Sequence, residues 1–396
     1  MEDVIIVGGG PTGFLTAIGL AQSGVRLTVI EAEPAISDSP RAAVYHWSVI
    51  EGLEKLGIRR QVESAGFAKQ DYTYLVHKTG ERIEFSLEVL NGLTPFPYNL
   101  HLGQHRLVEI ASRKLAEYSQ AQVRFGTRLL GLSQQADGVT LQVATPSGTE
   151  TLRAKWVVGA DGAASAVRHE LALGFDGMTW PERFVATNVY FDFERYHYAR
   201  ATFLIDDVHG AVIAKLDNSG LWRCTYMEDA QLPEHTVLER LPQAYAAILP
   251  GTVDYEVQRA APYRMHQRSA PHYRLGRVVL VGDAAHVTNP TGGLGLTSGI
   301  FDCFALFPAL AAVLAERADH SVLDRYSDAR RQMFLNHISP QAVANKRLIY
   351  HANGGGSSLE EALTNLRRLR TDREFLLQRL MFLKSIESPP LLGNLS

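Results

Sequence analysis

Three glycines near the N-terminus have the spacing of a phosphate-binding turn. Gly8, Gly10 and Gly13 form a G-x-G-x-x-G pattern directly after the apolar run 4–7. In a strand–turn–helix unit the first glycine permits the tight turn, the second lets the backbone approach a pyrophosphate, and the third lets helix and strand pack closely. The phosphates then lie on free N–H groups at the positive end of the helix. The pattern therefore predicts a dinucleotide site.

An acidic residue stands where the ribose of that dinucleotide needs a partner. Glu31 closes the second apolar run, residues 27–30, which follows the helix expected after Gly13. A carboxylate at this strand end can accept hydrogen bonds from both ribose hydroxyls. Glycines alone would be weak evidence, but glycines, strand context and a correctly placed acid together are strong. The motif does not say which dinucleotide is bound.

Two later motifs add polar and glycine positions at further strand ends. One runs over residues 159–168, and the other contains Asp283 and the glycines of 292–295. Asp283 follows the apolar run 278–281 and can accept hydrogen bonds from sugar or ribityl hydroxyls. The glycines open a helix expected from about Leu296, which places free N–H groups and a positive dipole at a second site. Such a helix end stabilises the negative charge that a reduced flavin carries.

The elements that position these motifs are of two kinds. Continuous apolar runs predict buried parallel strands, and they lie at 4–7, 27–30, 123–132, 156–158 and 278–281. Short segments rich in β-branched and aromatic residues predict a mostly antiparallel sheet, and they lie at 71–76, 82–86, 184–193, 201–205, 211–216 and 221–227. From Thr297 the pattern is helical nearly to the end, apart from the Gly/Ser-rich residues 353–358.

Composition sets broad limits on the function. The 396 residues are 46% hydrophobic and 20% charged with a net charge of −3, which favours a folded globular protein without a nucleic-acid surface. Two cysteines, Cys224 and Cys303, fit a reducing compartment and are best interpreted as buried small hydrophobes. No His or Cys spacing predicts a metal site, and no signal peptide is visible. The apolar stretch 300–314, broken by Asp302 and Pro308, is too short to span a bilayer. We therefore expect a cytoplasmic protein.

The three motifs in this order resemble the FAD-dependent aromatic hydroxylases of the para-hydroxybenzoate hydroxylase type, which are single-component flavoprotein monooxygenases. Further matches fall in place over residues 1–335: the Ser-Pro-Arg-Ala segment 39–42, Gln104 before Leu107, and Tyr326 with Arg330 and Arg331. The resemblance implies an α/β fold with a doubly wound FAD-binding domain of the Rossmann-like, glutathione-reductase type. We assign 1–70, 97–175 and 275–345 to this domain, 71–96 and 176–274 to an inserted β-sheet substrate domain, and 346–396 to a helical C-terminal segment.

The resemblance also implies a reaction. In this family NADH or NADPH reduces a non-covalently bound FAD, which adds O2 at its C4a position, and the hydroperoxide attacks an electron-rich ring. We expect hydroxylation of a small phenolic or heteroaromatic substrate by a monomer or homodimer. Two alternatives stay open. One is epoxidation, decarboxylative hydroxylation or ring cleavage of a larger polycyclic substrate, and the other is a non-catalytic FAD-binding protein.

Carried onto this sequence, the resemblance assigns site residues. The expected FAD-binding residues are Gly8, Gly10, Pro11, Thr12, Gly13, Glu31, Ala32, Arg41, Gln104, Leu129, Asp161, Asp283, Gly293, Gly295 and Leu296. The expected catalytic residues are Arg41, His46 and Pro290. The expected substrate-binding residues are Tyr45, Tyr190, His209, Arg223 and Tyr226. We expect the nicotinamide to dock on the surface near Asp161 and Arg168.

The histidines have competing interpretations. His46 follows Arg41 in the segment that resembles the flavin-facing stretch, where a histidine could take a phenolic proton because its pKa suits neutral pH. The alternative is a surface or packing histidine on the next helix. His286 is expected to support the turn of the third motif. The C-terminal segment 359–383 is expected to be a packed or dimer-forming helix rather than a membrane-binding one.

Overall fold

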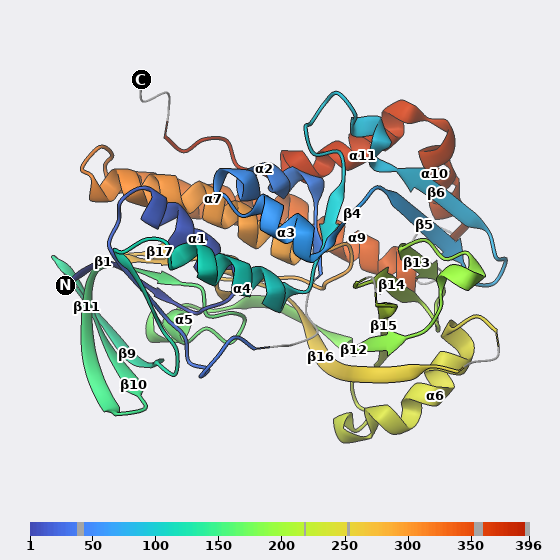
Figure 1. Cartoon of the computed structure of the whole chain (residues 1–396), viewed down its shortest axis with the longest axis horizontal. Coiled ribbons are helices and arrows are strands. Elements are labelled where there is room, and N and C mark those ends of the chain that lie inside the picture. The colour runs from blue at the N-terminus through green and yellow to red at the C-terminus, as the bar shows by residue number, and fades with distance from the viewer. Residues whose placement is uncertain (38–42, 218, 252–253, 352–358, 393–396) are drawn as a thin grey trace.

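The structure is a computed structural model that describes residues 1–37, 43–217, 219–251, 254–351 and 359–392. Figure 1 shows two large β-sheets toward opposite ends of the long axis, with helices packed along them. A small third sheet lies between the helices. The predicted α/β class is confirmed, while the domain boundaries assigned above stay a prediction.

The first sheet has the N-terminal strand near its centre. The parallel strands β1, β2, β11 and β18 form its core, because their apolar runs are buried on both faces, and the partly exposed β8 pairs with β2 at the edge. β9 and β10 extend β11 as an antiparallel ribbon. The strand bounds are β1 Glu2–Val7, β2 Leu27–Ile30, β8 Ala121–Arg124, β9 Arg128–Gln135, β10 Gly138–Thr145, β11 Gly148–Gly159, β17 Arg274–Leu275 and β18 Val278–Leu280.

One predicted strand of this sheet is wrong. The apolar run 123–132 is two strands, since β8 ends at Arg124 and β9 begins at Arg128. The chain turns between them at Gly126, whose φ of +62° lies in the left-handed region that favours glycine. β8 is parallel to β2, whereas β9 pairs antiparallel with β10. The apolar composition could not reveal this reversal.

Helices α1, α4 and α7 cover one side of this sheet (Figure 1). α1 and α7 pack so closely that a Cβ atom at Gly19 would overlap the Phe307 ring. α7 begins at Leu294, slightly before the predicted start. It is long and apolar enough to cross a bilayer, contrary to the estimate from 300–314, but 72% of its most apolar window is buried inside the protein. The bounds are α1 Pro11–Gln22, α4 Gln104–Leu115, α5 Ala166–Glu170, α7 Leu294–Leu314 and the 3-10 turn η4 Gly282–Ala284.

The second sheet has the order β19-β16-β12-β15-β14-β13-β5-β6. Its pairs are antiparallel except for β13 and β5, and β5 and β6 join it as predicted. β12 begins well before the predicted residue 184 and pairs along its length with β16. The bounds are β5 Asp71–Val76, β6 Arg82–Ser86, β12 Asp176–Tyr190, β13 Ala201–Ile205, β14 Ala211–Lys215, β15 Leu221–Asp229, β16 Glu256–Ser269 and β19 His286–Val287.

Each face of the second sheet has its own cover. α6 packs on one face with Val185, Trp222 and Cys224. On the opposite face α9 contributes Ile349 and Tyr350 to a cluster with strand residues, and the C-terminal helices α10 and α11 cover β5 and β6. The bounds are α6 Val237–Ile248, α8 Ser321–Met333, α9 Ser339–Tyr350, α10 Leu359–Thr371 and α11 Arg373–Ser385, with short helices η1 Leu87–Leu90, η2 Glu194–Tyr196, η3 Glu234–Thr236 and the π-helix η5 Phe334–Ile338.

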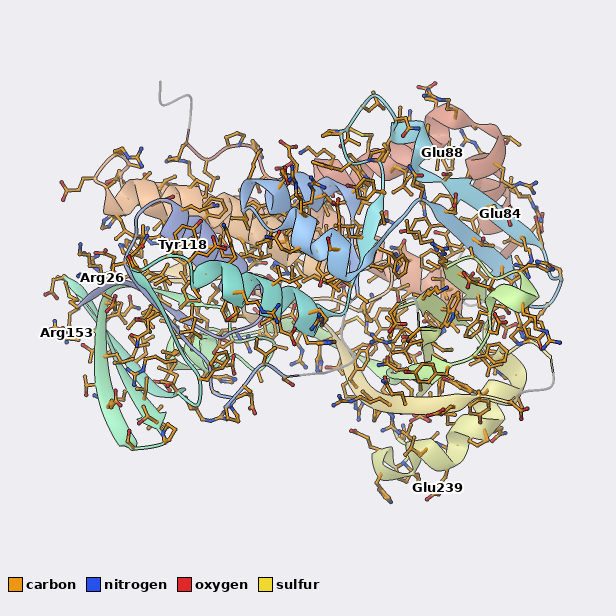
Figure 2. The ribbon with its side chains drawn as sticks, in the orientation of Figure 1. Arg26, Glu84, Glu88, Tyr118, Arg153 and Glu239 are labelled. Atoms are coloured by element: carbon orange, nitrogen blue, oxygen red, sulfur yellow. The ribbon has the colours of Figure 1, made fainter. Side chains whose placement is uncertain are left out.

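The C-terminal segment 359–383 is two helices rather than one. They meet at Asp372, whose side chain accepts a hydrogen bond from the Phe375 N–H and so begins α11. Their leucines are buried in the cluster over β5 and β6, which agrees with the expectation of a packed segment. Figure 2 shows charged side chains at the outline of the molecule instead, with Glu84 and Glu88 near these helices and Arg26 and Arg153 at the far end.

A small sheet connects the two halves. It consists of β3 Val44–Tyr45, β7 Asn99–His101 and β4 Phe67–Lys69. Helices α2 Trp47–Lys55 and α3 Arg59–Ala65 lie between β3 and β4 in the sequence. β7 pairs antiparallel with both neighbours. Because side chains alternate along a strand, this sheet has one face toward the core of the first half and one toward the second sheet.

Candidate active site

The N-terminal glycine turn has the shape that a pyrophosphate requires. Gly8 has φ +109°, and a Cβ atom there would overlap the backbone of Ala160. A Cβ at Gly13 would overlap the carbonyl oxygen of Gly8, so helix and strand pack as the motif predicts. At Gly10 a Cβ would meet no heavy atom within 4 Å, and no side chain caps α1 there. The first N–H groups of α1 thus face open space and fit a bound phosphate.

Glu31 is fixed beside this turn by the backbone. Its Oε2 accepts from the Gly9 N–H at 2.6 Å and its Oε1 from the Glu33 N–H at 2.9 Å. Each carboxylate oxygen has a second lone pair, so both can still accept from ribose hydroxyls. The neighbouring Ala32 lies at the same edge. Leu129 is buried and packs in the core of the first half, and its contact with FAD stays a prediction.

The second motif, residues 159–168, is stabilised by hydrogen bonds that its own side chains make. Asp161 accepts from the Ser165 hydroxyl at 2.5 Å and from the Val167 N–H at 3.0 Å. Burial raises the pKa of Asp161, while these hydrogen bonds lower it. Arg168 is 3% exposed and donates to the carbonyl oxygens of Ala284 and Ala163 at 2.9 and 2.8 Å. The expectation of a surface Arg168 for nicotinamide docking is therefore wrong, because its guanidinium satisfies buried carbonyls.

The third motif leaves one side chain pointing outward. Asp283 is exposed, whereas its neighbours Gly282 and Ala284 are buried. A carboxylate held outward on a short rigid turn can reach a ligand that lies along the surface of the turn. This placement fits the predicted contact with ribityl hydroxyls.

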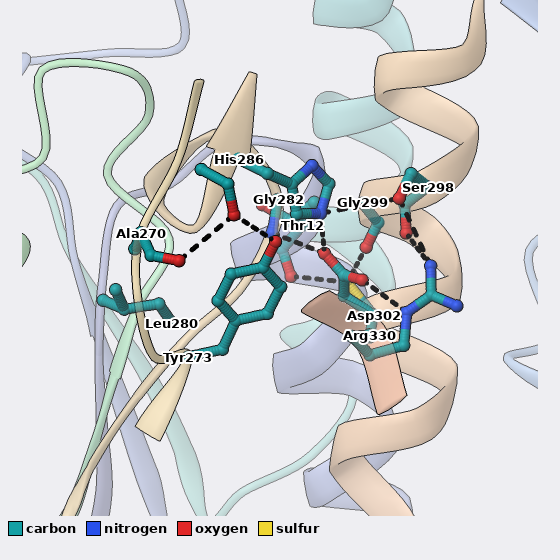
Figure 3. Close-up of polar contacts among 12 residues, drawn as sticks. Thr12, Ala270, Tyr273, Leu280, Gly282, His286, Ser298, Gly299, Asp302 and Arg330 are labelled. Carbon is teal, nitrogen blue, oxygen red and sulfur yellow. Dashed lines mark hydrogen bonds and ion pairs between the residues drawn. The ribbon is translucent and has the colours of Figure 1, made fainter. Parts of the chain in front are cut away.

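A buried ion network anchors that turn to α7 (Figure 3). Asp302 Oδ2 accepts from His286 Nε2 at 2.7 Å and from the Gly282 N–H at 3.0 Å, and its Oδ1 accepts from Arg330 Nε at 2.6 Å. Burial would raise the pKa of Asp302, but His286 and Arg330 lower it to about 2. His286 supports the turn, as expected. Sequence reasoning missed Asp302, although an acid in an apolar helix was a visible signal.

The second glycine turn meets the segment that holds His46. Gly292 and Gly293 have φ values of +88° and +69°, and α7 begins directly after them. His46 Nε2 lies 2.8 Å from the Gly292 carbonyl oxygen. Since a carbonyl only accepts, Nε2 carries the proton and Nδ1 has a free lone pair. Pro290 precedes the turn and is exposed, and Gly295 and Leu296 form the first turn of α7.

His46 has the properties of a base. Its Nδ1 is buried and has no hydrogen-bond partner in the described part of the chain. Burial lowers the pKa of His46, while the Gly292 contact raises it. The ring is therefore neutral near pH 7 and able to accept a proton at Nδ1. A cavity of about 30 Å3, enough for one water molecule, lies next to the turn. Its lining is Tyr74, Phe203, Thr291, Gly292, Asn345, Leu348 and Ile349.

The expected substrate-binding residues do not come together. Tyr45 is fully buried in the core of the first half, because the pleat of β3 turns it away from the second sheet. Tyr226 packs under α6 on the far face. His209 contacts His77 in the turn after β13, with ring centroids 5.9 Å apart. Tyr45 and Tyr226 are thus corrected to core residues.

The other expected residues are placed as follows. Arg223 lies on the face of β15 opposite α6 and donates from Nε to Asn188 Oδ1 at 2.9 Å. Tyr190 ends β12 and is partly exposed. Gln104 is the first residue of α4. Arg41 lies outside the described residues. A larger cavity, about 330 Å3, lies by Met1 and the start of β1, away from all three motifs.

Comparisons with known proteins agree with this geometry. A family model described as FAD binding domain matches residues 1–338. The chain is 42% identical to 6-hydroxy-3-succinoylpyridine 3-monooxygenase of Pseudomonas putida over 98% of both chains. It is 41% identical to para-nitrophenol 4-monooxygenase of a Pseudomonas species over 98% of this chain and 96% of the relative.

Solved structures give the same result. The crystal structure of p-nitrophenol 4-monooxygenase from Pseudomonas putida superposes with a TM-score of 0.93 at 38% identity, over 98% of both chains. A ternary complex of aklavinone-11 hydroxylase with FAD and aklavinone superposes with a TM-score of 0.80 at 30% identity, over 89% of this chain and 70% of that one.

Proposed function

Because this chain belongs to the FAD-dependent aromatic hydroxylases, its reaction is the hydroxylation of an aromatic substrate, and we propose that this substrate is a ring activated by its own hydroxyl group. The observation that carries the proposal is His46, a neutral base whose unpartnered Nδ1 lies beside the glycine turn at Gly292. The non-catalytic alternative is not retained, since the relatives that match the full chain are enzymes.

The names of the relatives support a position of attack. They place the oxygen at position 4 of para-nitrophenol and at position 3 of 6-hydroxy-3-succinoylpyridine. In both rings this is the carbon opposite the hydroxyl group. An ionised hydroxyl raises electron density at that carbon. For this chain we infer attack on a small ring at the carbon opposite its hydroxyl group. Where that carbon carries a substituent, as in para-nitrophenol, the new C–O bond replaces the bond to the substituent, and a nitro group leaves as nitrite.

The residues of this chain bind, orient and move a proton. The glycine turn, Glu31 and Asp283 would hold FAD, which when bound and reduced by NADH or NADPH would supply the activated oxygen. His46 accepts the proton of the ring hydroxyl at Nδ1 and keeps its Nε2 proton on Gly292. The aromatic side chains Tyr74 and Phe203 line the small cavity next to the turn, and their apolar surface limits the water there to about one molecule.

Compartment and assembly are further proposals. Cys224 and Cys303 are free and buried, which supports a reducing, cytoplasmic location. Among the described residues no cluster of His, Cys, Asp or Glu could hold a metal ion. We propose that the enzyme acts as a monomer or homodimer on a small substrate and O2.

The test is substrate-stimulated oxidation of NAD(P)H by the FAD-loaded enzyme. We expect 4-substituted phenols and 6-hydroxypyridines to stimulate oxidation at least 10-fold over their O-methyl ethers, because only the free hydroxyl can be deprotonated. Equal stimulation by phenol and ether would contradict the proposal. Stimulation by polycyclic substrates alone would favour the larger-substrate alternative.

A further inference from the structure

One face of the small sheet carries two buried nitrogen side chains that the mechanism above does not use. In the β4–β7 pairing, Phe67 lies opposite His101 and Lys69 lies opposite Asn99. These four side chains project from the same face, since residues two apart on a strand share a face. Lys69 is 5% exposed and His101 is fully buried. Residues 32 positions apart in sequence are thus neighbours in space.

The Lys69 Nζ has no hydrogen-bond partner in the described part of the chain. The ring nitrogens of His101 make no hydrogen bond of normal geometry there, and the one polar group that acts on the ring as an acceptor is the backbone of Lys215. An unsatisfied buried polar group costs about 1–3 kcal/mol, so such nitrogen atoms on one sheet face are unusual. Their neighbour Asn99 is satisfied, because it donates to the Tyr72 hydroxyl and accepts from the Trp47 N–H at 2.7 Å.

The surroundings favour an anion over a cation. The carboxylates that act on Lys69 are Asp71 and Glu194, and Arg200 opposes them. Glu194 is already paired with Lys215 at 2.7 Å and with Arg200 at 3.5 Å. Asp71 is exposed to solvent. No buried carboxylate therefore compensates Lys69 among the described residues.

Among the described residues no carboxylate is found to act on His101 either. The groups that act on it are Lys69, His46 and the backbone carbonyl of Lys215, and the ring of Phe67 lies with its centroid 5.0 Å away. Burial lowers the pKa of Lys69 to about 6 and that of His101 to about 3. Both groups are thus largely neutral at pH 7, and an anion placed beside them would favour protonation of Lys69.

This pair lies at one end of an aromatic wall whose other end is the glycine turn. The Lys69 Nζ lies 4.9 Å from the centroid of the Tyr72 ring, and Tyr72 stacks on Phe203 with centroids 6.5 Å apart. Phe203 lines the cavity next to Thr291, whose buried hydroxyl also has no partner in the described residues. His46 connects the two ends, because it contacts Gly292 and acts electrostatically on His101.

We propose that Lys69 and His101 form an oxyanion site that binds the ionised hydroxyl oxygen of the aromatic substrate. The inference rests on the proposed function and deepens it. His46 takes the proton from the ring oxygen, and Lys69 and His101 donate hydrogen bonds to the oxygen that becomes negative. Both act as positioning residues that select phenolate-type substrates over neutral rings.

The experiment measures binding to the FAD-loaded enzyme without NAD(P)H, so that no turnover occurs. 4-Nitrophenol is titrated across pH, and the visible band of its ionised form reports the pKa of the bound ligand. We expect this pKa to fall by at least one unit relative to free 4-nitrophenol. In Lys69→Met the shift is lost and binding weakens at least 10-fold, while binding of 4-nitroanisole, which has no ionisable hydroxyl, is unchanged. Lys78→Met, at an exposed lysine, is the matched control.

Three outcomes would overturn the proposal. The first is a pKa of bound 4-nitrophenol that is the same in Lys69→Met and in His101→Asn as in the wild type. The second is that Lys69→Met weakens the binding of 4-nitrophenol and of 4-nitroanisole equally. The third is Lys69-dependent binding of 4-nitrobenzoate without that of 4-nitrophenol, which would assign the site to a carboxylate. FAD content and thermal unfolding check that each variant is folded. Failure of the proposed function alone would give a different result from failure of the oxyanion site. In that case ionised 4-nitrophenol would still bind through Lys69, but no phenol would stimulate NAD(P)H oxidation.

Discussion

Replacing Asp302 with Asn tests whether the buried ion network fixes the third motif. The substitution keeps the size of the side chain but removes the charge that faces Arg330 and His286. Removing one member of a buried ion pair leaves its partner uncompensated and costs about 3–5 kcal/mol. We expect Asp302→Asn to lower the free energy of unfolding by this amount at neutral pH. Asp328→Asn, at an exposed acid of α8, should change it by less than about 0.5 kcal/mol.

The pH dependence gives a second, independent magnitude. The pKa of Asp302 is lowered from 3.8 to about 2 in the folded protein. At about 1.36 kcal/mol per pH unit, this contributes about 2.5 kcal/mol to stability. Because the folded pKa is the lower one, the contribution is fully present above about pH 4 and is lost as the pH falls toward 2. The difference between wild type and Asp302→Asn should therefore shrink on acidification.

Urea unfolding at several pH values measures both quantities. A difference in unfolding free energy of less than about 1 kcal/mol between Asp302→Asn and the wild type at neutral pH, or a difference that does not change with pH, would contradict this prediction. A loss of stability without loss of FAD would show that the network supports α7 but not the turn at Gly282.

Two further predictions concern the cofactor and the base. Asp283→Ala should weaken FAD binding by about 1–3 kcal/mol, roughly 5- to 150-fold, because a ribityl hydroxyl loses its acceptor. A fluorescence titration measures the affinity, and an unchanged value would show that the third motif is misassigned. His46→Ala should lower kcat about 10²- to 10⁴-fold at pH values below the pKa of the substrate hydroxyl, and far less at pH values above it. The exposed His337, replaced in His337→Ala, is the control. A uniform loss of kcat across the pH profile would show that His46 has a structural role only.

Local patterns were predictable because they act within one strand–turn–helix unit. The roles of Gly8, Gly13 and Glu31 depend on neighbours that the sequence already places together, and the structure has each in the expected geometry. The short segments rich in β-branched and aromatic residues likewise predicted most strands of the second sheet. The reversal at Gly126 was not predictable, because an apolar run does not indicate the direction of a strand.

Site residues on short strands depend on contacts that the sequence does not reveal. β3 has only two residues, so no period could show that Tyr45 faces the core while the next residue, His46, faces the glycine turn. Lys69 and His101 meet only because β4 pairs with β7 in one register. Arg168 looks like a surface cation in the sequence, yet it donates to the carbonyl of Ala163 in its own motif and to that of the distant Ala284.

The central claim is that bound FAD inserts one atom of O2 into an aromatic ring opposite its hydroxyl group. The most direct measurement is turnover of 4-nitrophenol by the FAD-loaded enzyme under ¹⁸O2 with NAD(P)H, followed by mass spectrometry of the product. Oxygen replaces the nitro group, which leaves as nitrite and gives the quinone. We predict one heavy oxygen per product, at the carbon opposite the original hydroxyl, and the other heavy atom in water. Label that enters the product from H2¹⁸O and not from ¹⁸O2 would contradict the account.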